Sequence, residues 1–233
     1  MNSSDDISFS PAEFSGVTRL FPLPNHVMFP HVVQPFHIFE QRYRDMVEDV
    51  LESDHLFTMV QLLPGWEPEY EGRPPVAPVG CLGKVLSHVQ LEGGRYNLLL
   101  AGVQRIQILE ELEPTASYRE ARGELLEDHY EAGGASRRQK IREQLLSCVR
   151  SYVPQLPEVH QQLDELLDCA APLGMLTDVV SHLAQLDAGA KQDLLSETSV
   201  DVRAQTLLNV LKDPASQASI FSRGTFPPGF SLN

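Results

Sequence analysis

Two apolar stretches stand near the start of the chain: residues 19–30 read RLFPLPNHVMFP and residues 35–43 read PFHIFEQRY. The segments 17–23 and 32–38 have the composition of extended backbone. Between and within them, Pro22, Pro24 and Pro30 lack the backbone N–H that a continuous hydrogen-bond ladder requires. The sequence therefore predicts a kinked pair of strands at the start of the fold.

A helix is expected directly after these strands. Apolar side chains recur at the three- and four-residue spacing that places them on one helical face, and the opposite face is charged. The apolar set is Tyr43, Met46, Val47, Val50 and Leu51. Residues 56–63 then have the composition of a buried strand, so one helix is predicted as an insertion among strands.

Residues 64–78 are predicted to form a long loop. They contain five prolines and two glycines together with Trp66 and Tyr70, a composition that excludes both a helix and a central strand. Such a loop commonly lies at the surface, where aromatic side chains offer contact area to a bound peptide. Trp66 and Tyr70 are therefore candidate peptide-binding residues.

The remainder of the first half predicts further strands. Residues 79–91 and 95–101 flank Glu92-Gly93-Gly94, where glycine can adopt the positive φ of a tight turn, so a β-hairpin is expected. Polar and apolar residues alternate over residues 104–108 and in part of residues 118–126. About six or seven short strands with one inserted helix can close into a small barrel.

Amphipathic helices are expected in the second half. Three sets of mostly apolar residues are each spaced so that they lie on one face of a helix. They are Ile141, Leu145, Cys148, Val149 and Tyr152; then Leu163, Leu166, Leu167 and Ala170; and last Val200, Ala204, Leu207, Leu208 and Leu211. Pro172 stands where a helix can start, and Asp187 and Ser199 are predicted N-caps. The expected domains are a β-barrel over residues 1–130, a helical bundle over 131–213 and a tail over 214–233.

Composition restricts the function. The chain has 18 Lys and Arg against 32 Asp and Glu, a formal net charge of −14, which opposes binding to a phosphate backbone. Basic candidates are only short segments, such as residues 137–140. No signal peptide or membrane span is recognisable, so a cytoplasmic protein is expected. Cys81, Cys148 and Cys169 show no metal-binding or redox spacing and are expected to be buried, reduced thiols.

The opening stretches resemble the signature of the N-terminal region of Lon-type proteases. Further segments follow in that family's order: VGCLGKV (79–85), GRYNL (94–98), AGVQRI (101–106), YREA (118–121), LTDVVSHL (176–183) and AKQDLLSE (190–197). The similarity spans about residues 17–212. It implies an α+β fold, with a small β-barrel like that of pseudouridine synthase and archaeosine transglycosylase (PUA-like) that carries one inserted helix and is followed by an α-helical bundle.

The resemblance also implies a function. That region of Lon-type proteases recognises polypeptide substrates, and the chain ends at Asn233 with no room for an ATPase module or a peptidase domain. A non-catalytic protein that binds unfolded or partner polypeptides through apolar contacts and strand-edge pairing is therefore expected, with its oligomeric state undetermined. Two alternatives stay open: an RNA-binding PUA-like protein, and a receptor that holds a small ligand in the barrel pocket.

No residue pattern indicates catalysis, a cofactor or a metal. Residues 80–85 read GCLGKV, with too few residues between the glycines for a phosphate loop, so a strand with a bulge or a close backbone approach is favoured. His26, His31 and His37 lack a coherent set of further ligands. Phe29 and Phe36 are retained as further candidate peptide contacts, although core packing, as for Phe39 and Tyr43, is the favoured role.

Overall fold

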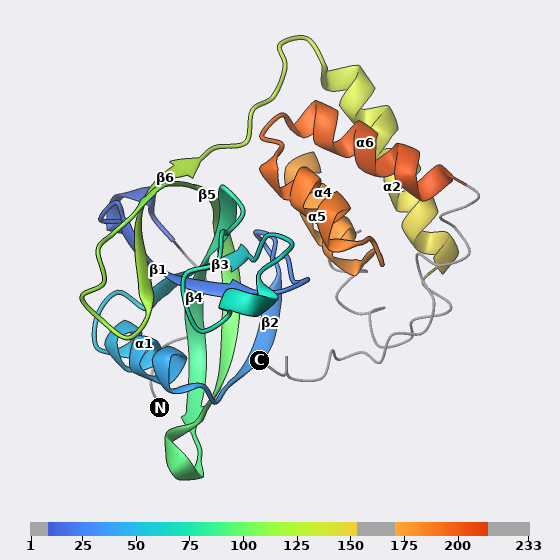
Figure 1. The fold of residues 1–233 in the computed structure, drawn as a ribbon. Coiled ribbons are helices and arrows are strands. Elements are labelled where there is room, and N and C mark those ends of the chain that lie inside the picture. The colour runs from blue at the N-terminus through green and yellow to red at the C-terminus, as the bar shows by residue number, and fades with distance from the viewer. Residues whose placement is uncertain (1–8, 153–170, 214–233) are drawn as a thin grey trace. The chain divides into compact units, whose positions relative to one another are not determined.

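The computed structural model describes residues 9–152 and 171–213. They form two compact units, one rich in strands that runs to Leu126 and one of helices that begins at Glu127 (Figure 1). The predicted apolar helix face at residues 163–170, Cys169 and the tail lie outside the described residues. No helix in the described part of the chain is both long and apolar enough to cross a membrane.

The first unit contains six strands, which are β1 (Val17–Leu23), β2 (Val33–Ile38), β3 (Leu56–Gln61), β4 (Val79–Gln90), β5 (Tyr96–Glu111) and β6 (Arg119–Leu126). β1 lies parallel to β3, whereas the pairs β3–β4, β4–β5, β5–β6 and β6–β1 are antiparallel. Since these five pairings return to β1, five strands close a ring. The small barrel expected from the sequence is confirmed.

β2 lies outside this ring and pairs only with the first half of β5 among the described strands. The expected pair formed by residues 17–23 and 32–38 is therefore wrong. Asn25 (φ 52°) and His31 (φ 65°) adopt left-handed backbone between the two strands, and the N–H of His31 donates to the carbonyl of Gly102 in β5. These turns bring β2 alongside β5 rather than β1.

β5 is one continuous strand where the sequence predicted two. The predicted interruption falls at Gly102, where a Cβ would lie 2.2 Å from the carbonyl oxygen of Phe29. Glycine is required there because another chain segment approaches the backbone closely. On the partner strand β4, Leu82 pairs with Gln104 and Gly83 with Gly102, so the extra residue of this bulge is Val103 of β5. For residues 80–85 the close backbone approach is confirmed instead, since a Cβ at Gly80 would lie 2.7 Å from the carbonyl oxygen of Met59.

The inserted helix α1 (Gln41–Leu51) packs onto the barrel through its predicted face. Its buried side chains are Tyr43, Met46, Val47 and Val50, while Leu51 is half-buried. The ring of Tyr43 meets that of Phe21 from β1 edge-on, with the centroids 4.6 Å apart. This contact anchors the start of the helix in the barrel core.

The helical unit contains α2 (Ala135–Tyr152), α4 (Leu173–Leu183), α5 (Ala188–Ser196) and α6 (Val200–Lys212), and α6 packs against both α2 and α4. Both predicted caps are confirmed, since the side chain of Asp187 accepts from the N–H of Ala190 and that of Ser199 from the N–H of Val202. Cys148 is only half-buried, because it lies at the margin of the packed face of α2, and this corrects the expectation of full burial.

A buried arginine joins the start of this unit to two of its helices. Arg203 of α6 is fully buried, and its guanidinium lies 2.8 Å from a carboxylate oxygen of Asp128 and 3.3 Å from one of Asp178 in α4, which is itself buried. On the same helix, Asp201 forms an ion pair of 2.9 Å with Arg138 of α2. Residues just after the barrel are therefore held by the helical unit.

Lys191 of α5 provides a pH-dependent contribution to the stability of this unit. Burial lowers the pKa of Lys191 to about 8, and its ammonium donates to the carbonyl of His182. Between that value and the ordinary pKa of lysine, the unfolded chain binds more protons than the folded one, so stability rises with pH. We expect up to about 1.5 kcal/mol of increase between about pH 8 and 9.5. Lys191→Met should lack this increment in urea unfolding followed by circular dichroism, and an unchanged slope would contradict it.

Candidate functional site

Two of the candidate contact residues lie on a loop that is fixed to the barrel. The rings of Trp66 and Tyr70 meet at 5.3 Å between centroids, and both side chains are half-buried. The hydroxyl of Tyr70 donates to Glu40 at 2.6 Å, and the Arg42 guanidinium lies 4.7 Å from the centre of the Tyr70 ring. Burial, followed by the hydrogen bond to Glu40, raises the pKa of Tyr70 to about 12. The aromatic pair is thus a fixed feature at the start of α1.

The structure places the other two candidates in the core. Phe29 is 0% exposed and Phe36 is 1% exposed, so neither side chain can reach a bound peptide. The ring of Phe36 packs edge-on against that of Phe21, with the centroids 6.1 Å apart. These two residues are therefore withdrawn as candidate contacts. By contrast, Phe39 is 36% exposed, which corrects the expectation that it packs in the core.

Phe39 belongs to an apolar surface that the sequence did not reveal. Strand register aligns His37 of β2 with Asn97 of β5 and Val89 of β4, and the next row aligns Pro35, Leu99 and Ser87. Since side chains alternate between the two sides of a sheet, these residues share the side opposite the buried Phe36 and Ile38. We call this surface the sheet face and define it by Val33, Pro35, His37, Phe39, Ser87, Val89, Asn97 and Leu99.

Large apolar side chains on the sheet face are open to solvent. Val33 is 42% exposed and Val89 is 60% exposed. His37 binds Asn97 through a contact of 2.7 Å between Nδ1 and Oδ1, and its ring stacks on that of Phe39 with 6.1 Å between centroids. A polar pair is therefore surrounded by apolar groups, an arrangement that can bury apolar area against a partner.

A small hollow opens beside the loop that carries Trp66 and Tyr70. Its volume is about 180 Å³, and it is lined by Arg42, Tyr43, Glu71, Gly72, Arg73, Pro114, Ala116, Ser117, Tyr118 and Arg119. We call it the arginine hollow. Arg42 pairs with Glu40 at 2.9 Å, and both Arg73 and Arg119 pair with Glu111. Three guanidinium groups thus meet at one place in an acidic chain.

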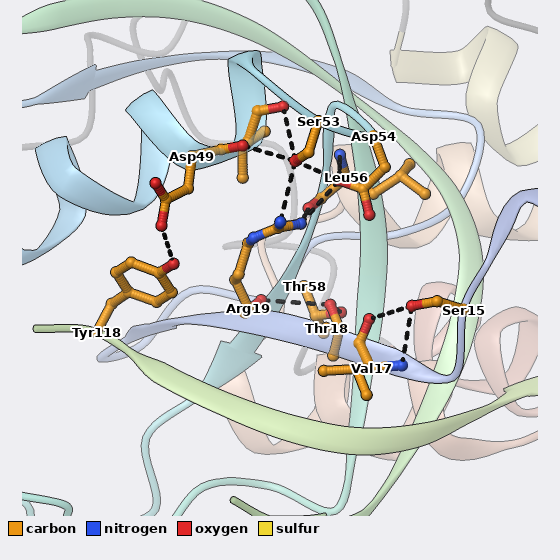
Figure 2. A network of polar contacts seen from close by, with 11 residues as sticks. Ser15, Val17, Thr18, Arg19, Asp49, Ser53, Asp54, Leu56, Thr58 and Tyr118 are labelled. Carbon is orange, nitrogen blue, oxygen red and sulfur yellow. Dashed lines mark hydrogen bonds and ion pairs between the residues drawn. The ribbon is translucent and has the colours of Figure 1, made fainter. Parts of the chain in front are cut away.

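A polar network holds the wall of the arginine hollow. Arg19 of β1 donates to Asp54 at 2.7 Å and to the Ser53 hydroxyl at 3.0 Å, and the hydroxyl of Tyr118 donates to Asp49 of α1 (Figure 2). Burial, followed by the contact with Asp49, raises the pKa of Tyr118 to about 12. These contacts tie β1 to the segment just after α1 and tie the second half of α1 to the segment before β6, and they fix the position of Tyr118.

The geometry agrees with comparisons to known proteins. The family model of the "ATP-dependent protease La (LON) substrate-binding domain" matches residues 17–213. The chain belongs to this family. Relatives include a Lon protease of Rhizobium meliloti, 24% identical over 92% of this chain, and Lon protease 1 of Bdellovibrio bacteriovorus, 26% identical over 85%. These matches cover 26% and 25% of the two relatives, so the chain spans about a quarter of their length.

Solved Lon structures have the same fold. The N-terminal domain of Mycobacterium avium complex Lon protease matches with a TM-score of 0.67 at 15% identity, over 85% of this chain and 99% of that chain. A Lon N-terminal domain protein from Xanthomonas campestris matches with a TM-score of 0.58 at 20% identity, over 83% and 97% respectively. The resemblance read from the sequence to Lon N-terminal regions is confirmed, and with it the barrel followed by helices.

Possible metal ligands and the basic segment were also considered as sites in this Lon-family chain. Within the described ranges, no three His, Cys, Asp or Glu side chains gather as a possible metal site. Of the basic segment 137–140, Arg138 is engaged with Asp201, so its charge is largely neutralised. Two surface features therefore remain as candidate binding sites, the sheet face with its exposed apolar area and the arginine hollow. Both lie on the barrel unit.

Proposed function

We propose that this Lon-family domain binds unfolded or extended polypeptide segments through the sheet face and performs no covalent chemistry on them. The observation that carries the proposal is the exposed apolar area of Val33, Phe39 and Val89 on a rigid three-stranded surface. Burying apolar area is the main favourable contribution to association with an apolar segment. Membership of a family described as a substrate-binding domain supports the same role.

Side-chain contact is favoured over strand addition as the binding mode. β2 is the edge strand of the sheet face, and Pro35 near its centre has no backbone N–H. Proline on an edge strand removes one of the donors that an added strand would use. The partner would therefore lie across the sheet face and bury its apolar side chains against Val89, Leu99 and Phe39.

The net negative charge of the chain restricts which polypeptides it is expected to bind. The net charge of −14 opposes nucleic acids and strongly acidic polypeptides, and it favours apolar segments flanked by neutral or basic residues. Steering by this charge acts mainly on the association rate and is reduced by salt. The apolar contribution of the sheet face is retained when salt is added, so the two contributions can be separated experimentally.

Isothermal titration calorimetry tests the proposal. Reduced lysozyme with its cysteines capped by iodoacetamide is a basic polypeptide that stays unfolded, and native lysozyme is the matched folded control. We expect binding of the unfolded form with a Kd of about 1–100 μM that persists from about 0.15 to 0.5 M salt, with a negative heat-capacity change. Equal binding of both forms, or binding lost with salt, would refute it, as would preferential binding of RNA.

A further inference from the structure

One of the residues that line the arginine hollow carries a hydroxyl without a hydrogen-bond partner among the described residues. Tyr43 is 2% exposed, and its hydroxyl oxygen is buried without a hydrogen-bond partner among the described residues. Buried polar groups are nearly always hydrogen-bonded, so such an atom requires an explanation. Because Tyr43 lines the arginine hollow, a group that enters the hollow can supply the missing acceptor.

The hydroxyl of Tyr43 is a donor at neutral pH. Burial raises the pKa of Tyr43 above the ordinary value for tyrosine, so the phenol keeps its proton. The Arg42 guanidinium lies 4.7 Å from the centre of the same ring. A protonated phenol beside guanidinium groups presents hydrogen-bond donors and positive charge together, which selects for an anionic acceptor.

Arg73 supplies a second donor at the hollow. Its Nη2 atom contacts Glu111 at 3.0 Å and donates to the carbonyl of Leu112 at 2.7 Å. Within the described residues, its Nε and Nη1 atoms make no hydrogen bond. Its side chain as a whole is 37% exposed and so is open to solvent. Of the three arginines, Arg73 therefore has exposed donors to offer, whereas Arg119 is engaged with Glu111 and a backbone carbonyl. Arg42 donates to Glu40 and to the carbonyl of Tyr70, and its Nη2 atom, which makes no hydrogen bond among the described residues, is buried 2.9 Å from Glu40.

We propose that the arginine hollow binds a carboxylate group of the polypeptide partner, with the Tyr43 hydroxyl and the Arg73 guanidinium as its donors. A carboxylate has two oxygens, one for each donor, and a volume of about 180 Å³ admits it together with a small side chain. The α-carboxylate at a chain end and the side chain of Asp or Glu share this chemistry. This inference rests on the proposed function, because it names one feature of the polypeptide that the domain recognises.

Small probes test the hollow without the sheet face. The intact chain would be titrated with N-acetylalanine, with N-acetylalanine amide as the neutral analogue and with the α-amide of N-acetylaspartate, which keeps its side-chain carboxylate. The backbone amides of Gly72, Arg73 and Ser117 would be followed by ¹⁵N NMR. We expect saturable shifts with at least one carboxylate and none with the neutral amide. The two carboxylate probes distinguish a chain end from an acidic side chain.

Matched variants separate a ligand contact from a structural role. Tyr43→Phe removes only the unpartnered hydroxyl, so the fold should be kept while carboxylate affinity falls about tenfold, and Arg73→Gln should cause a similar loss. Glu71→Gln removes the acidic group of the hollow and should strengthen binding. Arg95→Gln, at the exposed β4–β5 turn, should leave affinity unchanged.

Three outcomes would overturn the inference: unchanged carboxylate affinity in Tyr43→Phe and Arg73→Gln, equal shifts with the neutral amide, or tighter binding of inorganic phosphate than of either carboxylate. The sheet face is tested independently by unfolded lysozyme. A chain that binds the small carboxylates but not lysozyme would refute the proposed function and leave the hollow's chemistry intact. The reverse result would refute only the hollow.

Discussion

Replacing Arg203 with Met is expected to destabilise the helical unit by about 3–5 kcal/mol. Arg203 lies at 0% exposure between Asp128 and Asp178, and Asp178 is also 0% exposed. Methionine can fill much of the volume but carries no positive charge, so the buried carboxylate of Asp178 loses the guanidinium that offsets its charge. Urea unfolding followed by helical circular dichroism should show a much lower midpoint for the variant.

A control and a second substitution identify the cause. Arg137→Met makes the same chemical change at an exposed position of α2 and should alter stability by less than about 0.5 kcal/mol. Asp178→Asn combined with Arg203→Met removes both charges and should recover part of the lost stability, because the pair is coupled. If the double variant loses the sum of the two single effects, the ion pair is not the source of the stability.

Replacing Val89 with Asp should weaken binding of an unfolded polypeptide by at least about tenfold. Val89 is 60% exposed on the β4 side of the proposed binding surface, so a carboxylate there would lose water when a partner covers it. Folding should be little affected, because the side chain makes few buried contacts. Calorimetry with the capped, unfolded lysozyme measures the effect.

Leu109→Asp is the matched control for that substitution. Leu109 is 61% exposed and lies on the second half of β5, outside the residues that define the sheet face. The Leu109→Asp substitution introduces the same charge on the same barrel, at a position whose exposure is nearly equal to that of Val89. Similar losses in both variants would indicate that charge in general, rather than the sheet face, controls binding, and the proposed surface would then be wrong.

Local signals predicted the elements of this fold well. The caps at Asp187 and Ser199 depend on side chains within three residues of the amides that they bind, so the sequence contains all the necessary information. Local signals did not predict which strands pair with each other. β2 leaves β1 for β5 because Asn25 and His31 adopt left-handed backbone, and neither is glycine, the residue that usually indicates such a turn.

The sheet face escaped prediction for a related reason. Residues 33–39 alternate between two sets, and both sets are apolar: Phe36 and Ile38 face the core, whereas Val33 and Phe39 face outward. Alternation identifies the two sides of a strand, but it identifies the buried side only when the other side is polar. The loop aromatics Trp66 and Tyr70 stood out by composition, and their role as peptide contacts remains a proposal.

Because β2 lies outside the closed ring, residues that face outward from β2 are expected to affect partner binding more than they affect folding of the barrel. Val33, Pro35 and His37 point away from the interior, and the five ring strands complete their pairings without them. Substitutions at these positions can therefore accumulate at little cost to folding. Under the proposed function, the choice of bound polypeptide can change through these positions while the barrel stays the same.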